Sequence, residues 1–331
     1  MSLGNLAEHV RTAPKLSDVL FEEPSRNFGT IAALPSNVQA IEAALLFSTG
    51  LRGFLALVGP SGWGKSHVLE AAACRISQDT GVPPRVYSAI EWIHLGARAD
   101  APGSLLLDNV QDALDGARTR LLLQIALERR VRGGRPTMLS FTASKPTRQI
   151  KSLLPNLREW TVAQIPAPDP VERTLVIDQM ATAEGLHLSP TLVRLMASKM
   201  KGNGRTLSGA LKRLRLSGTI WTDARQILRA CGTLDPFFSD NSAWDLGDRI
   251  LRTAEEAEFK GLDIRSSHLA IHTMLREAGL GEAAVARCFG VQPAEVYAVA
   301  ERFELIASGN EETRKLSRRF VHRVVESLSI D

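Results

Sequence analysis

The feature that most constrains this chain is the stretch GPSGWGKS at residues 59–66. The apolar run before it, residues 54–58, predicts a buried strand, and the pattern after it, residues 67–73, predicts a helix. Strand, G-x-x-x-x-G-K-S and helix in this order are the context of a phosphate-binding P-loop. Backbone N–H groups of the loop and the helix N-terminus would surround phosphate oxygens, with Lys65 on the β/γ-phosphates and Ser66 on Mg²⁺. The residues expected at the phosphates are Gly59, Ser61, Gly62, Trp63, Gly64, Lys65 and Ser66. The sequence therefore predicts a bound nucleoside triphosphate or diphosphate; the alternative is a glycine-rich turn that binds nothing.

A second apolar run, residues 104–107, ends in Asp108, roughly 40 residues beyond the loop. In P-loop proteins a carboxylate at the end of such a strand holds the Mg²⁺ shell, so we expect Asp108 to share the metal with Ser66. A buried strand that ends in a turn-forming Asp is by itself unspecific. The P-loop upstream favours the metal-binding interpretation.

The residue after this carboxylate is Asn109. ATPases of this kind usually have Asp or Glu at this position, where the side chain polarises the attacking water. Asn can orient a water molecule but cannot accept its proton at neutral pH. We therefore expect slow or absent intrinsic hydrolysis, that is, a weak or partner-dependent ATPase.

The expected strand at residues 136–142 is followed by polar residues. A polar side chain at the end of this strand would lie between the phosphates and Asp108. Thr142 and Ser144 are therefore candidates for a sensor of the γ-phosphate. The alternative is a capped turn before Pro146.

The chain changes character along its length. Strands are expected at 54–58, 85–88, 104–108, 136–142 and 161–165, with helices between them, which predicts a parallel α/β sheet covered on both faces. From residue 169 the pattern is helical only. We therefore expect an N-terminal arm at 1–19, an α/β nucleotide-binding domain at 20–168, a helical lid at 169–231, a linker at 232–243 and a helical domain at 244–331.

Charge and cysteine content restrict the class of protein. The net charge is +4, but residues 241–331 hold 12 Lys and Arg against 15 Asp and Glu, so the positive charge belongs to the earlier part of the chain. The three cysteines show no metal-like or disulfide-like spacing, which suits a reducing compartment. No apolar run approaches the length of a membrane span. We expect a cytoplasmic protein with no membrane partner.

The last unit contains a helix-turn-helix pattern. Helical segments are expected at 265–278, 282–289 and 293–305. The second and third are joined by a turn containing Gly290, and the third opens at Pro293, as in many DNA-binding proteins. The alternative is an ordinary three-helix unit, because the candidate recognition helix carries three glutamates against Arg302, which phosphates would repel.

These motifs resemble the DnaA/Hda group of AAA+ ATPases, which comprises the bacterial replication initiator and a regulatory relative. The matching segments are LPSN at 34–37, the P-loop with His67 behind it, LLDNVQ at 106–111, LPNL at 154–157, EW at 159–160 and GNGRTLSGAL at 202–211. The resemblance implies a five-stranded parallel P-loop core with a helical lid, followed by an all-α helix-turn-helix-like domain. It implies ATP or ADP with Mg²⁺ as the ligand, with His67 at the nucleotide and Arg205 as a second sensor that reaches the phosphates from the lid.

The last unit resembles the DNA-binding domain of the same group more faintly, at 264–265, 269–271 and 285–290. On this match Arg265 would enter the DNA minor groove, and Gln292 and Arg302 on the candidate recognition helix are further candidate DNA contacts. The group's Asp-His-Thr-Thr signature is replaced by QPAE at 292–295. Its usual base contacts are therefore not carried over.

Two further departures concern assembly and hydrolysis. Only 16 residues separate Ser88 from Leu105, too few for the helical insertion that lets initiators stack into a spiral. The short form resembles Hda, as does Asn109. The group's arginine finger has no clear counterpart; Arg158 is either this finger or a solvated arginine.

The resemblance implies a nucleotide-state switch in bacterial replication initiation or its control, bound to duplex DNA through the last domain. The alternative is a protein-binding adaptor that contacts the initiator through its AAA+ face and does not bind DNA. Expected partners are duplex DNA, the replication initiator or other replication proteins, and further copies of the chain in a nucleotide-dependent homo-oligomer. The expected location is the cytoplasm, in association with the nucleoid.

Overall fold

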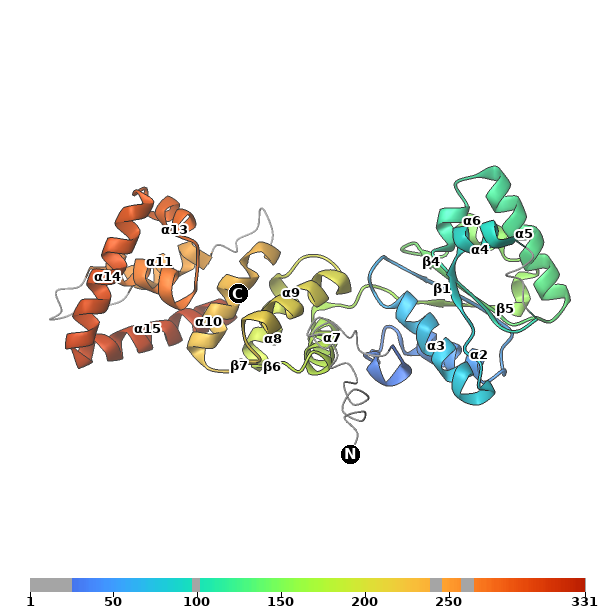
Figure 1. Ribbon diagram of the computed structural model, residues 1–331, viewed down its shortest axis with the longest axis horizontal. Helices are drawn as coiled ribbons and strands as arrows, with labels where there is room; N and C mark the ends of the chain where they lie inside the picture. The colour runs from blue at the N-terminus through green and yellow to red at the C-terminus, as the bar shows by residue number, and fades with distance from the viewer. Residues whose placement is uncertain (1–25, 97–101, 239–245, 257–264, 331) are drawn as a thin grey trace, which may run out of the picture.

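The computed structural model describes residues 26–96, 102–238, 246–256 and 265–330. The expected arm at 1–19 and residues 239–243 of the expected linker lie outside these ranges. Figure 1 shows an elongated molecule, with an α/β part at one end and a run of helices that extends to the other end. No helix in the described ranges combines the length and apolar character needed to cross a membrane.

Among the described residues, five parallel strands form one sheet in the order β2-β3-β4-β1-β5. The strands are β1 (Phe54–Gly59), β2 (Val86–Ser88), β3 (Leu105–Asp108), β4 (Thr137–Thr142) and β5 (Trp160–Gln164). Every residue of β1 is buried, as expected for a parallel strand that is covered on both faces. The predicted five-stranded parallel sheet is confirmed.

Helices cover both faces of this sheet (Figure 1). The helices are α2 (Val38–Ser48), α3 (Lys65–Thr80), α4 (Ala89–Leu95), α5 (Ala117–Arg132) and α6 (Arg148–Leu153), and short 3₁₀ turns occur at η1 (Phe28–Thr30), η3 (Val110–Ala113) and η4 (Leu157–Glu159). Leu55 and Leu57 of β1 pack with α2 and α3, whereas Phe54, Ala56 and Val58 pack with α4, α5 and α6. This alternation follows from the two-residue period of a strand.

Four further helices follow the sheet, namely α7 (Pro170–Ala183), α8 (Pro190–Lys199), α9 (Gly204–Ser217) and α10 (Ala224–Leu234). Each begins after a polar residue whose side chain accepts a hydrogen bond from the first turn; these N-caps are Asp169, Ser189, Asn203 and Asp223. The expectation of helices alone beyond residue 169 is wrong. The strands β6 (His187–Leu188) and β7 (Ile220–Trp221) pair in parallel, and two residues are too few to give a period in the sequence.

The last part of the chain is helical. It consists of α11 (Leu246–Glu255), α12 (Ser266–His272), the π-turn η6 (Thr273–Glu277), α13 (Glu282–Phe289), α14 (Pro293–Gly309) and α15 (Glu311–Ile330). The turn between α13 and α14 lies where the sequence predicts it, and Gly290 ends α13 in the left-handed conformation with φ 64°. The sequence interpretation did not include α11 or the 20-residue α15.

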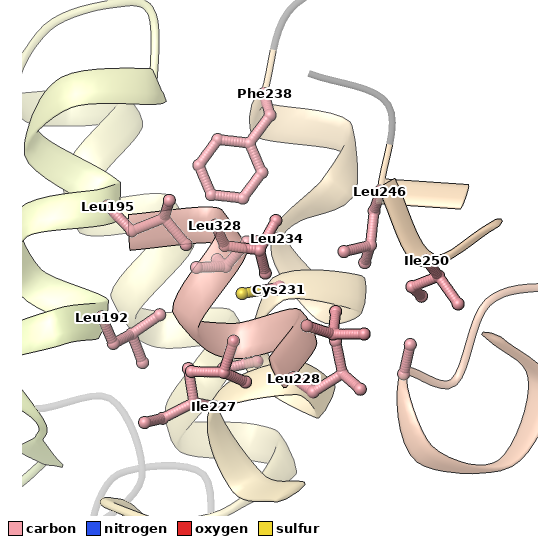
Figure 2. Packing of buried hydrophobic residues seen from close by; sticks show 14 of the residues in the cluster. Leu192, Leu195, Ile227, Leu228, Cys231, Leu234, Phe238, Leu246, Ile250 and Leu328 are labelled. Atoms are coloured by element: carbon pink, nitrogen blue, oxygen red, sulfur yellow. The ribbon is translucent and has the colours of Figure 1, made fainter. Parts of the chain in front are cut away.

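The lid helices and the last helices share one hydrophobic core. Figure 2 shows Leu192 and Leu195 of α8, Leu228 and Cys231 of α10 and Leu328 of α15 in the same cluster as Leu246 and Ile250 of α11. A Cβ atom on Gly232 would lie 1.9 Å from the carbonyl oxygen of Ala278, so α10 and the last part of the chain are in backbone contact.

The described part of the expected linker is not extended chain. Residues 232–234 complete α10, residues 235–237 form the 3₁₀ turn η5 (Asp235–Phe237), and Phe238 is buried in the shared core (Figure 2).

Candidate nucleotide-binding site

The loop of residues 59–66 connects β1 to α3 as the motif predicts. Gly62 and Gly64 have φ angles of 79° and 93°, a left-handed conformation that side chains with a Cβ atom adopt rarely. Gly59 lies at the end of β1, where a Cβ atom would come within 2.1 Å of the backbone oxygen of Ile165. Three glycines of the motif therefore have a geometric reason to be glycine.

Lys65 is the first residue of α3, and it is buried, with 5% of its surface exposed. Its Nζ donates a hydrogen bond to the carbonyl oxygen of Pro60 at 2.8 Å. Burial lowers the pKa of Lys65, the charge of Asp108 opposes this effect and the charge of Arg205 adds to it. A buried ammonium held mainly by one carbonyl is stabilised further by an anion, which fits a phosphate ligand.

Ser66 and Asp108 meet at the mouth of the loop. The Ser66 hydroxyl donates to Asp108 Oδ2 at 2.6 Å. Asp108 Oδ1 accepts from the Ser140 hydroxyl and, at 3.0 Å, from the Asn109 backbone N–H. A hydroxyl and a carboxylate side by side are the oxygen ligands that Mg²⁺ takes from a protein when phosphates and water complete its shell. These two residues therefore fit the expected metal.

Ser140 is a site residue that the sequence interpretation missed. It is fully buried in β4, and its hydroxyl also accepts from the Asn109 backbone N–H at 3.1 Å. Leu107 lies opposite Leu139 in the parallel pair of β3 and β4, which brings Asp108 and Ser140 next to each other. A polar residue inside an otherwise apolar strand is the signal that could have identified Ser140.

Asn109 and Thr142 both line the pocket. The Gln111 side chain lies within hydrogen-bonding distance of both residues. Asn109 has φ 52°, and Gln111 Oε1 accepts from the Thr142 backbone N–H at 2.8 Å. Ser144 and Arg158 are exposed and do not line this pocket. Of the two candidate sensors, Thr142 is the one near the phosphate loop.

The lid touches the loop directly. The Gly204 N–H donates to the Gly62 carbonyl oxygen at 3.1 Å, and the Asn203 side chain packs on Gly62, where a Cβ atom would lie within 2.4 Å of it. A Cβ atom on Gly204 would in turn come within 2.5 Å of the Gly62 oxygen. The N-terminus of α9 therefore rests on the P-loop backbone.

One face of α9 points into the pocket. Arg205, Ser208 and Lys212 line it, and their spacing places them on the same side of the helix. Arg205 is the residue that the sequence predicts there, whereas Lys212 was not predicted. Arg173 of α7 strengthens the contact between lid and loop, because its guanidinium lies 5.7 Å from the centre of the Trp63 ring.

One wall of the pocket is apolar. Its residues come from the segment before α2, from the connection between β5 and α7, and from α7, namely Ile31, Ala32, Leu34, Pro168, Val176 and Met180. His67 lines the same pocket, and its Nε2 lies 2.9 Å from Thr30 Oγ1. Burial is the largest cause that lowers the pKa of His67, so this imidazole is neutral at pH 7. The pocket has a volume of about 540 Å³, which suits a ligand of nucleotide size.

The expected DNA contacts lie at separate points of the last helices. Arg265 precedes α12, Gln292 precedes α14 and Arg302 lies on α14, and all three are exposed. Gln292 and Arg302 are about 15 Å apart along the helix axis. The Glu295 carboxylate accepts from the Gln292 backbone N–H at 3.2 Å, so a negative charge lies at the start of α14.

No protein-family model and no curated protein matches the sequence. Solved structures of DnaA do match the fold. Domain III of the Thermotoga maritima replication initiation protein DnaA covers 66% of this chain and 99% of its own, at 20% identity and a TM-score of 0.55. AMPPCP-bound DnaA from Aquifex aeolicus covers 93% of this chain and 98% of its own, at 16% identity and a TM-score of 0.52.

A replication initiator DnaA bound to AMPPCP and single-stranded DNA matches over 92% of this chain and 99% of its own, at 15% identity and a TM-score of 0.52. The likeness thus extends from the sheet to the last helices. Identities this low establish a shared fold. The chain therefore has the fold of these DnaA structures.

Proposed function

We propose that this chain binds ATP or ADP as a DnaA-like AAA+ protein and acts in bacterial chromosome replication initiation or in its regulation. The observation that carries the proposal is the pocket where the P-loop, the end of β3 and the N-terminus of α9 meet. The DnaA fold over nearly the whole chain supports the replication role, and the AMPPCP-bound forms among the matching initiators support nucleotide binding.

Each group of the pocket has a role in this proposal. Lys65 and the loop N–H groups would neutralise the phosphates, and Ser66 and Asp108 would hold Mg²⁺. The metal would supply positive charge that offsets the charge of the phosphates. Arg205 and Lys212 would contact the phosphates from the lid, and the apolar wall would cover the base.

The proposed protein is a switch with weak hydrolysis. Asn109 orients water near the phosphates without accepting its proton, so the nucleotide state would persist. Thr142 lines the same pocket as the loop and would report the γ-phosphate. Arg158 lies on the exposed turn η4, from which it would act, if it is the arginine finger, on the pocket of a neighbouring copy in a homo-oligomer.

The shared core supports a route from the pocket to the last helices. Because α8 and α10 pack against α15 and α11, a nucleotide that favours one lid position would move the C-terminal helices with it. The nucleotide state would thereby change how the last domain meets a partner.

Duplex DNA is the partner that we propose for this domain, with Arg265, Gln292 and Arg302 as contacts. A salt titration of binding to a labelled duplex tests this. The affinity is expected to fall as salt rises, because bound phosphates release counterions. Arg265→Ala is expected to weaken binding roughly 3- to 10-fold, whereas Arg252→Ala, on an exposed residue paired with Asp248, leaves it unchanged. No binding at low salt, with or without ATP, would contradict DNA binding.

A second candidate function is a protein-binding adaptor that contacts the initiator through its AAA+ face. The acidic residues of α14 favour it, because Glu295, Glu301 and Glu304 are all exposed. Nucleotide-dependent binding to the purified initiator of the same host, without DNA binding, would establish the adaptor. In either case the proposed location is the cytoplasm, and association with the nucleoid is expected for the DNA-binding form.

A further inference from the structure

The last helix, α15, has one strongly basic face. Six exposed residues lie on it within ten positions, namely Arg314, Lys315, Arg318, Arg319, His322 and Arg323. No Asp or Glu interrupts the sequence from 314 to 323. The opposite face carries Phe320, Val321 and Val324, which are buried in the core shared with the lid. The basic residues are thus held on one side of a helix that is fixed by packing.

Within the described ranges, most of these charges have no ion-pair partner. Arg314 forms an ion pair with Glu311 at 3.4 Å. In the described part of the chain, Lys315, Arg318, Arg319 and Arg323 form no ion pair. The acidic residues of α15 lie on either side of the basic stretch. Glu311 and Glu312 are in the first turn, where negative charge favours a helix, and Glu326 follows Arg323 by three residues. Nothing comparable accounts for the basic residues in the middle of the helix.

The chemistry of this face fits phosphate. The guanidinium group of arginine presents N–H donors in a fork that matches phosphate oxygens. Ten residues of helix span about 15 Å, the axial length of four or five phosphates of one DNA strand at about 3.4 Å each. The four unpaired side chains can therefore reach several successive phosphates.

Other polyanionic partners fit less well. Cores of protein interfaces are rich in large apolar side chains, and helices that lie on membranes insert such side chains. Within residues 311–328 of α15, no large hydrophobic side chain is exposed. By contrast, α14 exposes Tyr297 and Leu305 by 41% and 75%, together with three glutamates. The exposed surface of α15 can therefore attract a partner mainly by its positive charge.

We propose that the basic face of α15, formed by Lys315, Arg318, Arg319 and Arg323, binds the phosphate backbone of duplex DNA. This inference rests on the proposed DNA-binding function and assigns most of the binding energy to α15 instead of α14. Phosphate contacts position a protein on DNA without reading its sequence. The face lies on the helix that packs against α10 and α11, so it belongs to the same rigid core as the lid.

The test is a salt titration with a variant in which all four residues become glutamine. The slope of log affinity against log salt changes by about 0.9 per lost phosphate contact, so a decrease in magnitude of roughly 3 to 4 is expected. The corresponding all-lysine variant keeps the charges and is expected to retain the slope. A matched control removes four exposed positive charges from the α/β part, as Arg132→Gln, Lys145→Gln, Arg148→Gln and Lys151→Gln.

The outcomes separate this inference from the function on which it rests. A wild-type protein that binds duplex DNA, with the slope lost only in the α15 glutamine variant, supports it. If wild type and variant bind with equal slopes, DNA binding stands and the assignment to α15 is overturned. If wild type binds no DNA at low salt, both are overturned. Binding to phosphatidylserine vesicles or to polyglutamate that depends on the four residues, in the absence of DNA binding, overturns the choice of partner. Circular dichroism of the variants checks that the fold is retained.

Discussion

At the P-loop, the charged groups of Lys65 and Asp108 are held by hydrogen bonds within the protein, whereas several basic side chains of α15 are exposed to solvent. Around the P-loop, Lys65, Asp108 and Ser66 lie close together, partly or fully buried, and each has a partner in the protein. On α15, Arg318 and Arg319 face solvent without an ion pair in the described ranges. The first arrangement is preorganised for one small ligand. The second suits a large partner that supplies its own charges.

The two ends also differ in the feature that determines what each surface can bind. At the nucleotide end, backbone geometry determines the site, since several of its glycines permit contacts that a Cβ atom would prevent. At the C-terminal end, the helix pair α13 and α14 has the shape of a DNA-binding unit, while its charges oppose that role. At this end, the charge distribution therefore determines which partner the surface can bind.

Gly204→Ala tests whether the nucleotide end depends on close backbone approach. The added Cβ atom would lie 2.5 Å from the Gly62 carbonyl oxygen, so α9 must move away from the P-loop. ATP affinity is expected to fall roughly 10- to 100-fold, about 1.4 to 2.8 kcal/mol, measured by calorimetric titration. Gly209→Ala is the control on the same helix, because its Cβ atom would meet only the Phe237 ring, at 3.9 Å. Equal affinity of the Gly204 variant and wild type would show that the lid contact is dispensable.

Asn109→Asp tests whether the nucleotide end lacks a general base. Asp tolerates the left-handed backbone of this position, so the substitution supplies a carboxylate without strain. Single-turnover hydrolysis of ATP is expected to rise roughly 10-fold or more when a neighbouring copy or partner supplies an arginine. The control is Asn109→Ser, which adds no base. Turnover of about 1 per second or faster by wild type alone would refute the argument.

His272 offers a pH test of the C-terminal end. It is buried, and its ring lies against Phe303 in a tilted arrangement with centroids 4.6 Å apart. Burial lowers the pKa of His272 from 6.5 to about 4, against the effect of Glu304 and aided by Arg276 and Arg225. The unfolded chain binds a proton at His272 more readily than the folded chain does. The contribution of neutral His272 to the stability of the fold is therefore complete above pH 6.5 and is lost as the pH falls towards 4. At about pH 5.5 the expected loss is about 1.4 kcal/mol.

Urea unfolding followed by circular dichroism, at about pH 7.5 and about pH 5.5, measures this loss. His272→Gln is expected to lower stability at both pH values and to reduce the difference between them. A difference as large in the variant as in wild type would assign the pH dependence to other groups.

Much of the α/β part could be predicted because its signals are local. The strand before the P-loop, the loop itself and the helix after it are consecutive in sequence, and a parallel sheet buried on both faces gives uninterrupted apolar runs such as residues 54–58. The caps of the lid helices are local as well, and Asp169 and Ser189 begin helices as such residues usually do.

The remaining features depend on contacts between distant segments. Ser140 belongs to the site only because β4 lies beside β3, and Lys212 only because α9 lies on the P-loop. The apolar wall of the pocket joins Ile31 to Met180 across the sequence. Periodicity along one segment contains no information about such pairs.

The same dependence on contacts between distant segments explains why the sequence predicts a linker that includes residues 232–238. Gly232, Pro236 and the polar residues after Phe238 have the composition of a flexible connection. The structure uses Gly232 for the close approach of Ala278 and buries Phe238 in the shared core. A glycine needed for packing and a glycine needed for flexibility look alike in a single sequence.

The central claim is that the P-loop pocket binds ATP with Mg²⁺ through the buried Lys65. Calorimetric titration of ATP and Mg²⁺ into wild type and Lys65→Ala tests it most directly, with the exposed Lys151→Ala as the control. Wild type and the control are expected to bind alike, and Lys65→Ala is expected to lose about 100-fold or more in affinity while keeping the same circular dichroism spectrum. ATP affinity retained in the folded Lys65→Ala variant would contradict the claim.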